Sequence, residues 1–129
     1  MLLRISYWWG ILADGVMTIL MLWPQGFLRF MNANLENGTS FAYGLANGAP
    51  LMFGWTLLLF WADRKPVQRK DILLLTLPVV FGYVLIKIHA IFSGIGAWQD
   101  SILLFIHQAA LMGMFIFSYL QNRDTDSKV

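Results

Sequence analysis

The sequence predicts an all-α integral membrane protein, an antiparallel four-helix transmembrane bundle with a short interfacial helix after the first span. Three observations indicate this fold class. Of the 129 residues, 58% are hydrophobic and 12% are charged, about half the charged share of a soluble domain. Four apolar runs are close to the roughly 20 residues that a helix needs to cross a bilayer. Basic residues gather in alternate connections between these runs, as expected for membrane topology.

The predicted spans form a single transmembrane domain and cover residues 5–23, 41–62, 72–92 and 101–119, followed by a polar tail at 121–129. Asp14 interrupts the apolar part of the first span, and no small-residue cleavage site follows at the usual distance. We therefore expect a retained helix and not a cleaved signal peptide. The chain has no cysteine, which excludes disulfides, thiolate metal sites and cysteine nucleophiles.

Charge predicts the orientation. The connection "DRKPVQRKD" between the second and third spans carries four basic residues, and Arg4, Arg123 and Lys128 flank the first and last spans. Lys and Arg mark the cytoplasmic side of short loops, so both termini are expected in the cytoplasm, in a bacterial or archaeal inner membrane. Because topology accounts for these basic residues, the lipid bilayer is the expected partner and nucleic acid is not.

The segment after the first span, "PQGFLRFMNANLENGTS", is too apolar for a plain loop. Its apolar residues recur at helical spacing, opposite a polar set; they are Phe27, Phe30, Met31 and Leu35, against Arg29, Asn32 and Glu36. This pattern predicts a short helix that lies in the membrane interface.

The polar residues within the spans are expected to meet in the outer half of the bundle. At 1.5 Å per residue, Lys87, His89 and His107 lie about 8, 5 and 9 Å below the outer surface, and Asp14 about 13 Å below it. The second span adds "YGLANGAP", in which Asn47, two glycines and Pro50 are expected to interrupt the helix. An interruption at membrane depth is tolerated where protein or a water-filled cavity satisfies the backbone.

Two interpretations of Lys87 stay open. Each buried charge in a membrane is costly without a partner, so Lys87 is expected to pair with Asp14, which shares a face with Gly10 and Thr18. Alternatively, Lys87 reaches up to the lipid headgroups, as long cationic side chains do.

The two histidines also allow alternatives. His89 is either an interfacial side chain or a functional group, and His107 is either a neutral residue hydrogen-bonded between helices or a ligand or proton site. A b-type haem held by His89 and His107 is a further alternative, although two histidines in four helices are a weak signal. No cofactor is the leading expectation, and the sequence shows no carboxylate cage for a metal.

The stretch "GILADGVMTILMLWPQGF", residues 10–27, resembles the first helix of the small multidrug resistance exporters. Those are short four-helix membrane proteins, in which one acidic residue midway along the first helix exchanges protons for cationic substrates. The resemblance places Asp14 at that carboxylate. The remaining chain departs from the pattern, because Lys87, His89 and His107 have no counterpart there.

These observations favour a small polytopic membrane protein with a polar outward-facing cavity that moves or senses a proton or small solute. The candidate binding or proton-coupling residues are Asp14, Asn47, Lys87, His89 and His107. One alternative is an accessory or assembly subunit of a larger membrane complex, and another is a histidine-based membrane enzyme or haem protein. A homo-oligomer or a partner membrane subunit is expected in either leading case.

Overall fold

The computed structural model describes residues 1–31, 38–95 and 97–122, and within these residues the chain forms five helices and no strand. Their bounds are α1 (Leu2–Met21), α2 (Pro24–Met31), α3 (Thr39–Asp63), α4 (Asp71–Phe92) and α5 (Trp98–Gln121). The prediction of an all-helical chain is confirmed. The predicted tail and the part of the interfacial segment beyond Met31 lie outside the described residues, apart from Gln121, Asn122 and residues 38–40.

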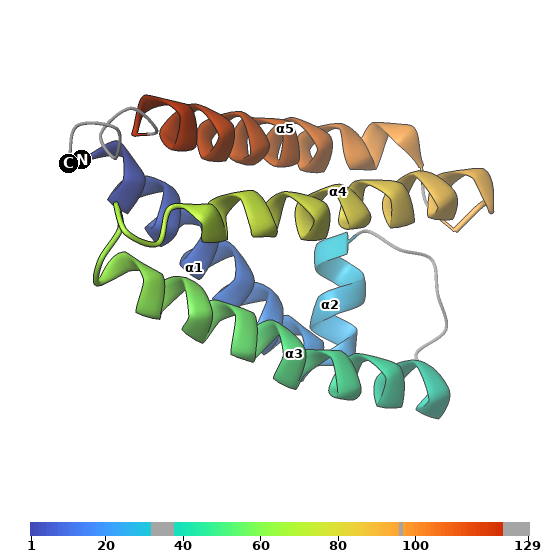
Figure 1. The fold of residues 1–129 in the computed structure, drawn as a ribbon. Helices are drawn as coiled ribbons and strands as arrows, with labels where there is room; N and C mark the ends of the chain where they lie inside the picture. Colours follow the sequence, from blue (N-terminus) through green and yellow to red (C-terminus); the bar gives the residue numbers. More distant parts are fainter. Residues whose placement is uncertain (32–37, 96, 123–129) are drawn as a thin grey trace.

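The four long helices lie side by side and alternate in direction, with the short α2 between α3 and α4 (Figure 1). α1 is central, because it packs along α3 and also contacts α5, while α4 pairs with α5. α3 and α4 lie farther apart near α2 than at their other ends, where a short connection joins them (Figure 1).

Within the described part of the chain, three helices are long and apolar enough to cross a membrane: α3, α4 and α5. They match the second, third and fourth predicted spans to within three residues at each end. α1 has 20 residues, but Arg4, Asp14 and the polar and aromatic groups near its start lower its mean hydropathy. Its crossing of the membrane stays a prediction.

The expected interruption of the second span is wrong. α3 is helical from Thr39 to Asp63 with Pro50 inside it, and the side chain of Asn47 donates a hydrogen bond to the Tyr43 carbonyl oxygen at 2.8 Å. A glycine inside a helix costs about 1 kcal/mol. Opening the backbone in an apolar medium costs several kcal/mol for each unsatisfied group, so the helix persists.

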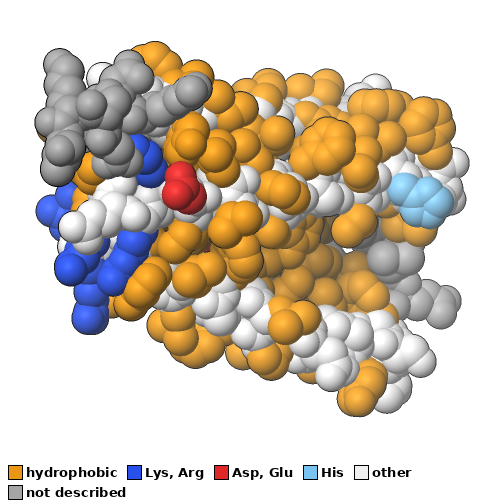
Figure 2. Space-filling view, in the orientation of Figure 1, with side chains coloured by type: hydrophobic (Ala, Val, Ile, Leu, Met, Phe, Trp, Pro, Cys, Tyr) orange, Lys and Arg blue, Asp and Glu red, His pale blue; other side chains and the backbone are white. Residues whose placement is uncertain are grey.

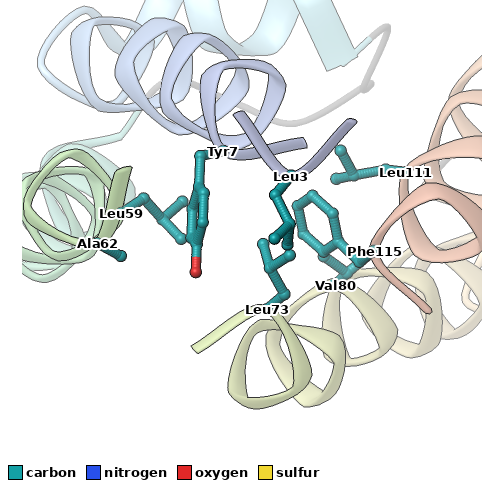
Figure 3. Packing of buried hydrophobic residues seen from close by; sticks show 8 residues of the cluster. All are labelled: Leu3, Tyr7, Leu59, Ala62, Leu73, Val80, Leu111 and Phe115. Carbon is teal, nitrogen blue, oxygen red and sulfur yellow. The ribbon is translucent and has the colours of Figure 1, made fainter. Parts of the chain in front are cut away.

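A compact apolar core lies between the long helices (Figure 3). It includes Ala62 near the end of α3 and Leu73 near the start of α4, so it extends toward the connection between these helices. Side chains from all four long helices point toward one another in this core; they are Leu3, Tyr7, Leu59, Ala62, Leu73, Val80, Leu111 and Phe115. Gly10 permits this packing. A Cβ atom at Gly10 would lie 3.0 Å from Leu59 Cδ1 and 3.3 Å from Phe115 Cζ, so α1 approaches α3 and α5 too closely for a larger residue.

Basic side chains gather at this same end, which we call the basic end and define by Arg4, Arg64, Lys65, Arg69 and Lys70. In the view of Figure 2, Lys and Arg cluster at one end of the molecule, and the surface beyond them is largely hydrophobic. We call the opposite end, where α2 lies, the α2 end. Among the described residues, the basic side chains therefore gather mostly at one end, as the sequence predicts, and Arg29 and Lys87 lie toward the other.

Gly10 provides a test of the core. Replacement by leucine forces the added side chain into Leu59 and Phe115, and overpacking of this kind typically costs 1–3 kcal/mol. We expect Gly10→Leu to lower the midpoint of thermal unfolding in detergent micelles. Gly54→Leu is the matched control, because a Cβ at Gly54 has no atom within 4 Å. Equal midpoints for the two variants would contradict the close approach of α1.

Candidate functional site

Four polar side chains, one from each long helix, lie directly beyond the apolar core on the side of the α2 end. We call this set the polar layer and define it as Asp14, Trp55, Tyr83 and Gln108. Each member is one helical turn from a buried core position of its own helix, and residues three or four apart share a helix face. The reference positions are Gly10, Leu59, Val80 and Leu111. On every long helix the polar side chain therefore lies one turn from the packed core, toward the α2 end.

Two members of the layer carry buried polar atoms without a hydrogen-bond partner among the described residues. They are the indole Nε1 of Trp55, a donor, and the amide Oε1 of Gln108, an acceptor. Buried polar groups are nearly always hydrogen-bonded, and leaving one without a partner costs about 1–3 kcal/mol. Both atoms thus require a polar species that the described side chains do not supply.

Asp14 and Tyr83 give the layer its ionisable groups. Asp14 is half-buried on the inward face of α1, between the buried Gly10 and Thr18. Tyr83 is half-buried on α4. The Thr18 hydroxyl donates a hydrogen bond to the backbone carbonyl oxygen of Asp14 at 2.8 Å. It therefore bonds to the backbone of Asp14 and not to the Asp14 carboxylate.

The layer combines complementary hydrogen-bonding groups. A carboxylate accepts, an indole N–H donates, and a phenol or an amide can do both. Such a set can hold a proton, a water molecule or a small polar solute. A metal ion is less suited to it, and the described residues contain no cluster of three His, Asp or Glu side chains that could hold one.

Lys87 does not form the predicted pair with Asp14, and its reach to the lipid headgroups stays a prediction. Its Nζ donates a hydrogen bond to the backbone carbonyl of Met31 at 2.9 Å, and Met31 is the last residue of α2. Among the described residues, Arg4 forms an ion pair with Asp63, whereas Asp14 and Lys87 form none. The expected Asp14–Lys87 pair is wrong. The carbonyls in the last turn of a helix lack helical partners and carry partial negative charge. The ammonium group of Lys87 is therefore stabilised by the end of α2.

Lys87 thereby fixes the end of α2 against α4. At the start of α2, the Trp23 ring covers Gly26 so tightly that a Cβ there would lie 2.2 Å from Trp23 Cε3. Farther along, Phe27 lies against Phe41 of α3, with ring centroids 6.3 Å apart. α2 is thus held between α3 and α4 where these helices diverge (Figure 1). The predicted helix after the first span exists, and it bridges two of the long helices.

The other sequence candidates lie outside the polar layer. Asn47 and His89 are exposed, and Asn47 bonds to its own helix. His107 accepts a hydrogen bond at its Nε2 from the Trp9 indole at 3.0 Å, with ring centroids 6.0 Å apart. This contact matches the alternative of a neutral histidine bonded between helices. Because His107 Nε2 already has a partner, the geometry of the described residues gives the haem alternative no support.

Sequence reasoning found one of the four layer residues, Asp14, and missed the rest. Trp55 resembles a belt tryptophan and Tyr83 an ordinary aromatic residue of an apolar span. A signal was present for Gln108. It continues a repeat of inward positions along α5, spaced alternately by three and four residues; these are Ser101, Leu104, Gln108, Leu111, Phe115 and Ser118.

No protein family, curated protein or solved structure was found to match this chain. The local resemblance of residues 10–27 to the small multidrug resistance exporters therefore gains no support from these comparisons. The function has to be inferred from the arrangement of the side chains.

The contact between Lys87 and Met31 yields a thermodynamic prediction. Lys87→Met should lower the free energy of unfolding in detergent by about 1.5–3 kcal/mol, the usual contribution of a hydrogen bond to a charged group. Adding Asp14→Asn should then act independently, and the two effects should sum to within about 0.5 kcal/mol.

Breaking a buried ion pair instead costs about 3–5 kcal/mol, and much of this loss is recovered when both charges are removed. Recovery in the double variant, measured by equilibrium unfolding, would contradict the observed arrangement. Arg29→Met on the exposed face of α2 is the control, expected to change stability by less than about 0.5 kcal/mol.

Proposed function

We propose that this chain is an integral membrane protein of four transmembrane helices, whose polar layer binds a proton or a small polar solute that enters from the α2 end. One observation carries the proposal. Asp14 and two buried, unpartnered polar atoms, on Trp55 and Gln108, each lie one helical turn from the apolar core. Ionisable residues within membrane spans are costly and typically mark ion or proton sites.

The packing of α1 supports a fourth span. A helix of 20 residues rises about 30 Å, the thickness of the hydrocarbon core. Leu12, Val16 and Ile19 on its outer face are 63%, 49% and 67% exposed, which suits contact with lipid. Asp14 is turned toward the bundle, so the charge that lowers the hydropathy of α1 avoids that lipid-facing surface.

The two ends of the bundle favour access from the α2 end. Toward the basic end, the polar layer meets the packed core, in which Leu59, Leu73 and Phe115 are completely buried. Toward the α2 end, α3 and α4 diverge and the short α2 lies between them (Figure 1). If the basic end is cytoplasmic, as the positive-inside rule predicts, the layer is reached from the outside and closed to the inside.

A second candidate function, an accessory subunit of a larger membrane complex, has one observation in its favour. α5 exposes three small residues on its surface, namely Ala109, Ala110 and Gly113, and a Cβ at Gly113 has no atom within 4 Å. Small residues let helices approach closely in lipid, so this surface suits a second copy or a partner subunit. The two functions are compatible, but the subunit function does not need an ionisable Asp14.

The proposal is tested by following carboxyl protonation with infrared difference spectroscopy on protein in lipid nanodiscs. We expect a carboxyl signal that titrates with the pH of the bathing buffer and disappears in Asp14→Asn. The control is Asp100→Asn, which removes an exposed carboxyl in the first turn of α5 and should leave that signal unchanged. A signal that survives in Asp14→Asn, or an Asp14 that does not exchange protons with the buffer, would sink the proposal and favour the subunit function.

A further inference from the structure

The basic end carries a second feature, separate from the polar layer. A hollow of about 530 Å³ opens there between the start of α1, the end of α3 and the connection to α4; it is lined by Arg4, Trp8, Phe60, Asp63, Arg64 and Pro66. We propose that this hollow binds the phosphate of an anionic phospholipid headgroup, in the leaflet next to the basic end.

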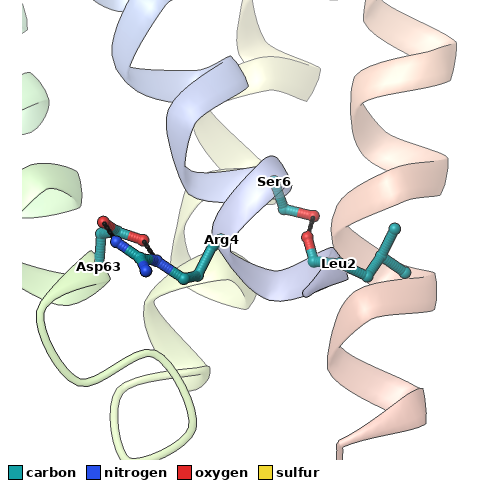
Figure 4. A network of polar contacts seen from close by, with 4 residues as sticks. All are labelled: Leu2, Arg4, Ser6 and Asp63. Carbon is teal, nitrogen blue, oxygen red and sulfur yellow. Dashed lines mark hydrogen bonds and ion pairs between the residues drawn. The ribbon is translucent and has the colours of Figure 1, made fainter.

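Arg4 is held in place for this role. Its guanidinium meets the Asp63 carboxylate side-on, with Nε to Oδ1 and Nη2 to Oδ2 both at 3.4 Å (Figure 4). The Asp63 side chain is 8% exposed, whereas that of Arg4 is 65% exposed. Asp63 therefore anchors one edge of the guanidinium, and the Nη1 amino group stays clear of that pair. A guanidinium that is already oriented loses little conformational freedom when it binds a phosphate.

Arg64 supplies the second cation. Its guanidinium carbon lies 5.7 Å from the centre of the Phe60 ring, within the range of a cation–π contact. With Arg4 and Arg64 against Asp63, the lining has a net positive charge of one. Neighbouring Lys65 and Arg69 at the basic end add to the positive field. A phosphate group is attracted by this positive charge, and it can accept two parallel hydrogen bonds from a guanidinium.

The aromatic walls favour a lipid as the source of the phosphate. Trp8 and Phe60 meet edge to face with ring centroids 6.2 Å apart, and they remain 43% and 42% exposed. Such rings suit the glycerol and upper acyl region of a lipid, at the depth where aromatic side chains gather in membrane proteins. Basic pockets between spans on one side of a membrane bind anionic headgroups in this manner.

The charge distribution favours an anionic lipid over a zwitterionic one. Arg64 already makes a cation–π contact with the Phe60 ring. The aromatic face that could bind the ammonium of a choline group is therefore occupied. A headgroup with a net negative charge keeps its attraction to both arginines, whereas the ammonium of a zwitterion is repelled by them. The site thus recognises charge at the headgroup and leaves the acyl chains unspecified.

Native mass spectrometry of the whole chain in neutral detergent tests the proposal. The probes are dioleoyl phosphatidylglycerol and dioleoyl phosphatidylcholine, titrated separately. We expect wild-type protein to bind the phosphatidylglycerol at least tenfold more tightly, and Arg64→Gln to weaken that binding at least fivefold. Arg29→Gln removes an exposed arginine near the α2 end and should change binding less than twofold.

Arg4→Lys is the second variant, because it keeps a cation beside Asp63 but removes the planar fork. It should fold, since Asp63 retains a partner, and should weaken phosphatidylglycerol binding several-fold. Equal binding of both lipids by wild-type protein, or an equal loss in Arg29→Gln and Arg64→Gln, would overturn the proposal. If inorganic phosphate at millimolar concentration raises the unfolding temperature as much as phosphatidylglycerol does, the ligand is a soluble phosphate and the lipid proposal fails.

Discussion

A bilayer offers no water to polar groups, so each one must find its hydrogen bond within the protein, and this constraint governs most of the structure. Hydroxyl side chains in the helices bond back to carbonyls one turn earlier, as Thr18, Thr56, Thr76 and Ser101 do. Ser6 and Ser118 join α1 to α5 through a hydrogen bond of 2.5 Å in the buried interior. α3 stays helical through its glycines and Pro50, and Lys87 satisfies a carbonyl at the end of α2. Trp55 and Gln108 depart from this rule, because each buries a polar atom without a hydrogen-bond partner among the described residues.

The same constraint separates the two ends of the molecule. At the basic end the helices pack tightly around Leu3, Leu59 and Phe115. Arg4, Arg64 and Lys65 lie exposed there, where headgroups and water can meet them, whereas Asp63 and Lys70 are buried. At the α2 end α3 and α4 diverge, and a short helix held by Lys87 and Phe41 lies between them (Figure 1). The apolar core and the polar layer are successive turns of the same helices. Close packing at Gly10 thus closes one side of the layer, and the bridge formed by α2 lies on the other.

Hydropathy was sufficient to predict the helices, because an apolar run of membrane length leaves few other structures. It also predicted α2, whose apolar residues recur at helical spacing. Contacts between helices were harder to predict. The Asp14–Lys87 pair was expected from similar depths, but depth says nothing about the backbone carbonyl at Met31, which is the nearer partner of Lys87. The interruption near Asn47 was expected from the low helix propensity of its neighbours. In an apolar medium, the cost of leaving backbone groups without hydrogen bonds exceeds that propensity, so the helix continues. Trp55, Tyr83 and Gln108 could not be predicted, because the sequence does not tell whether the polar atom of an aromatic or amide side chain is buried without a partner.

A polar layer that binds a proton or small solute must be reached by water, whereas the core one turn away must not. Hydroxyl-radical footprinting of the protein in lipid nanodiscs measures this directly, because radicals formed from water modify the side chains beside it. We expect Trp55 and Tyr83 in the layer to be modified at rates well above those of Tyr7 and Phe115 in the core. Equal protection of all four side chains would mean that the layer is dry, and it would contradict a proton or solute site at Asp14.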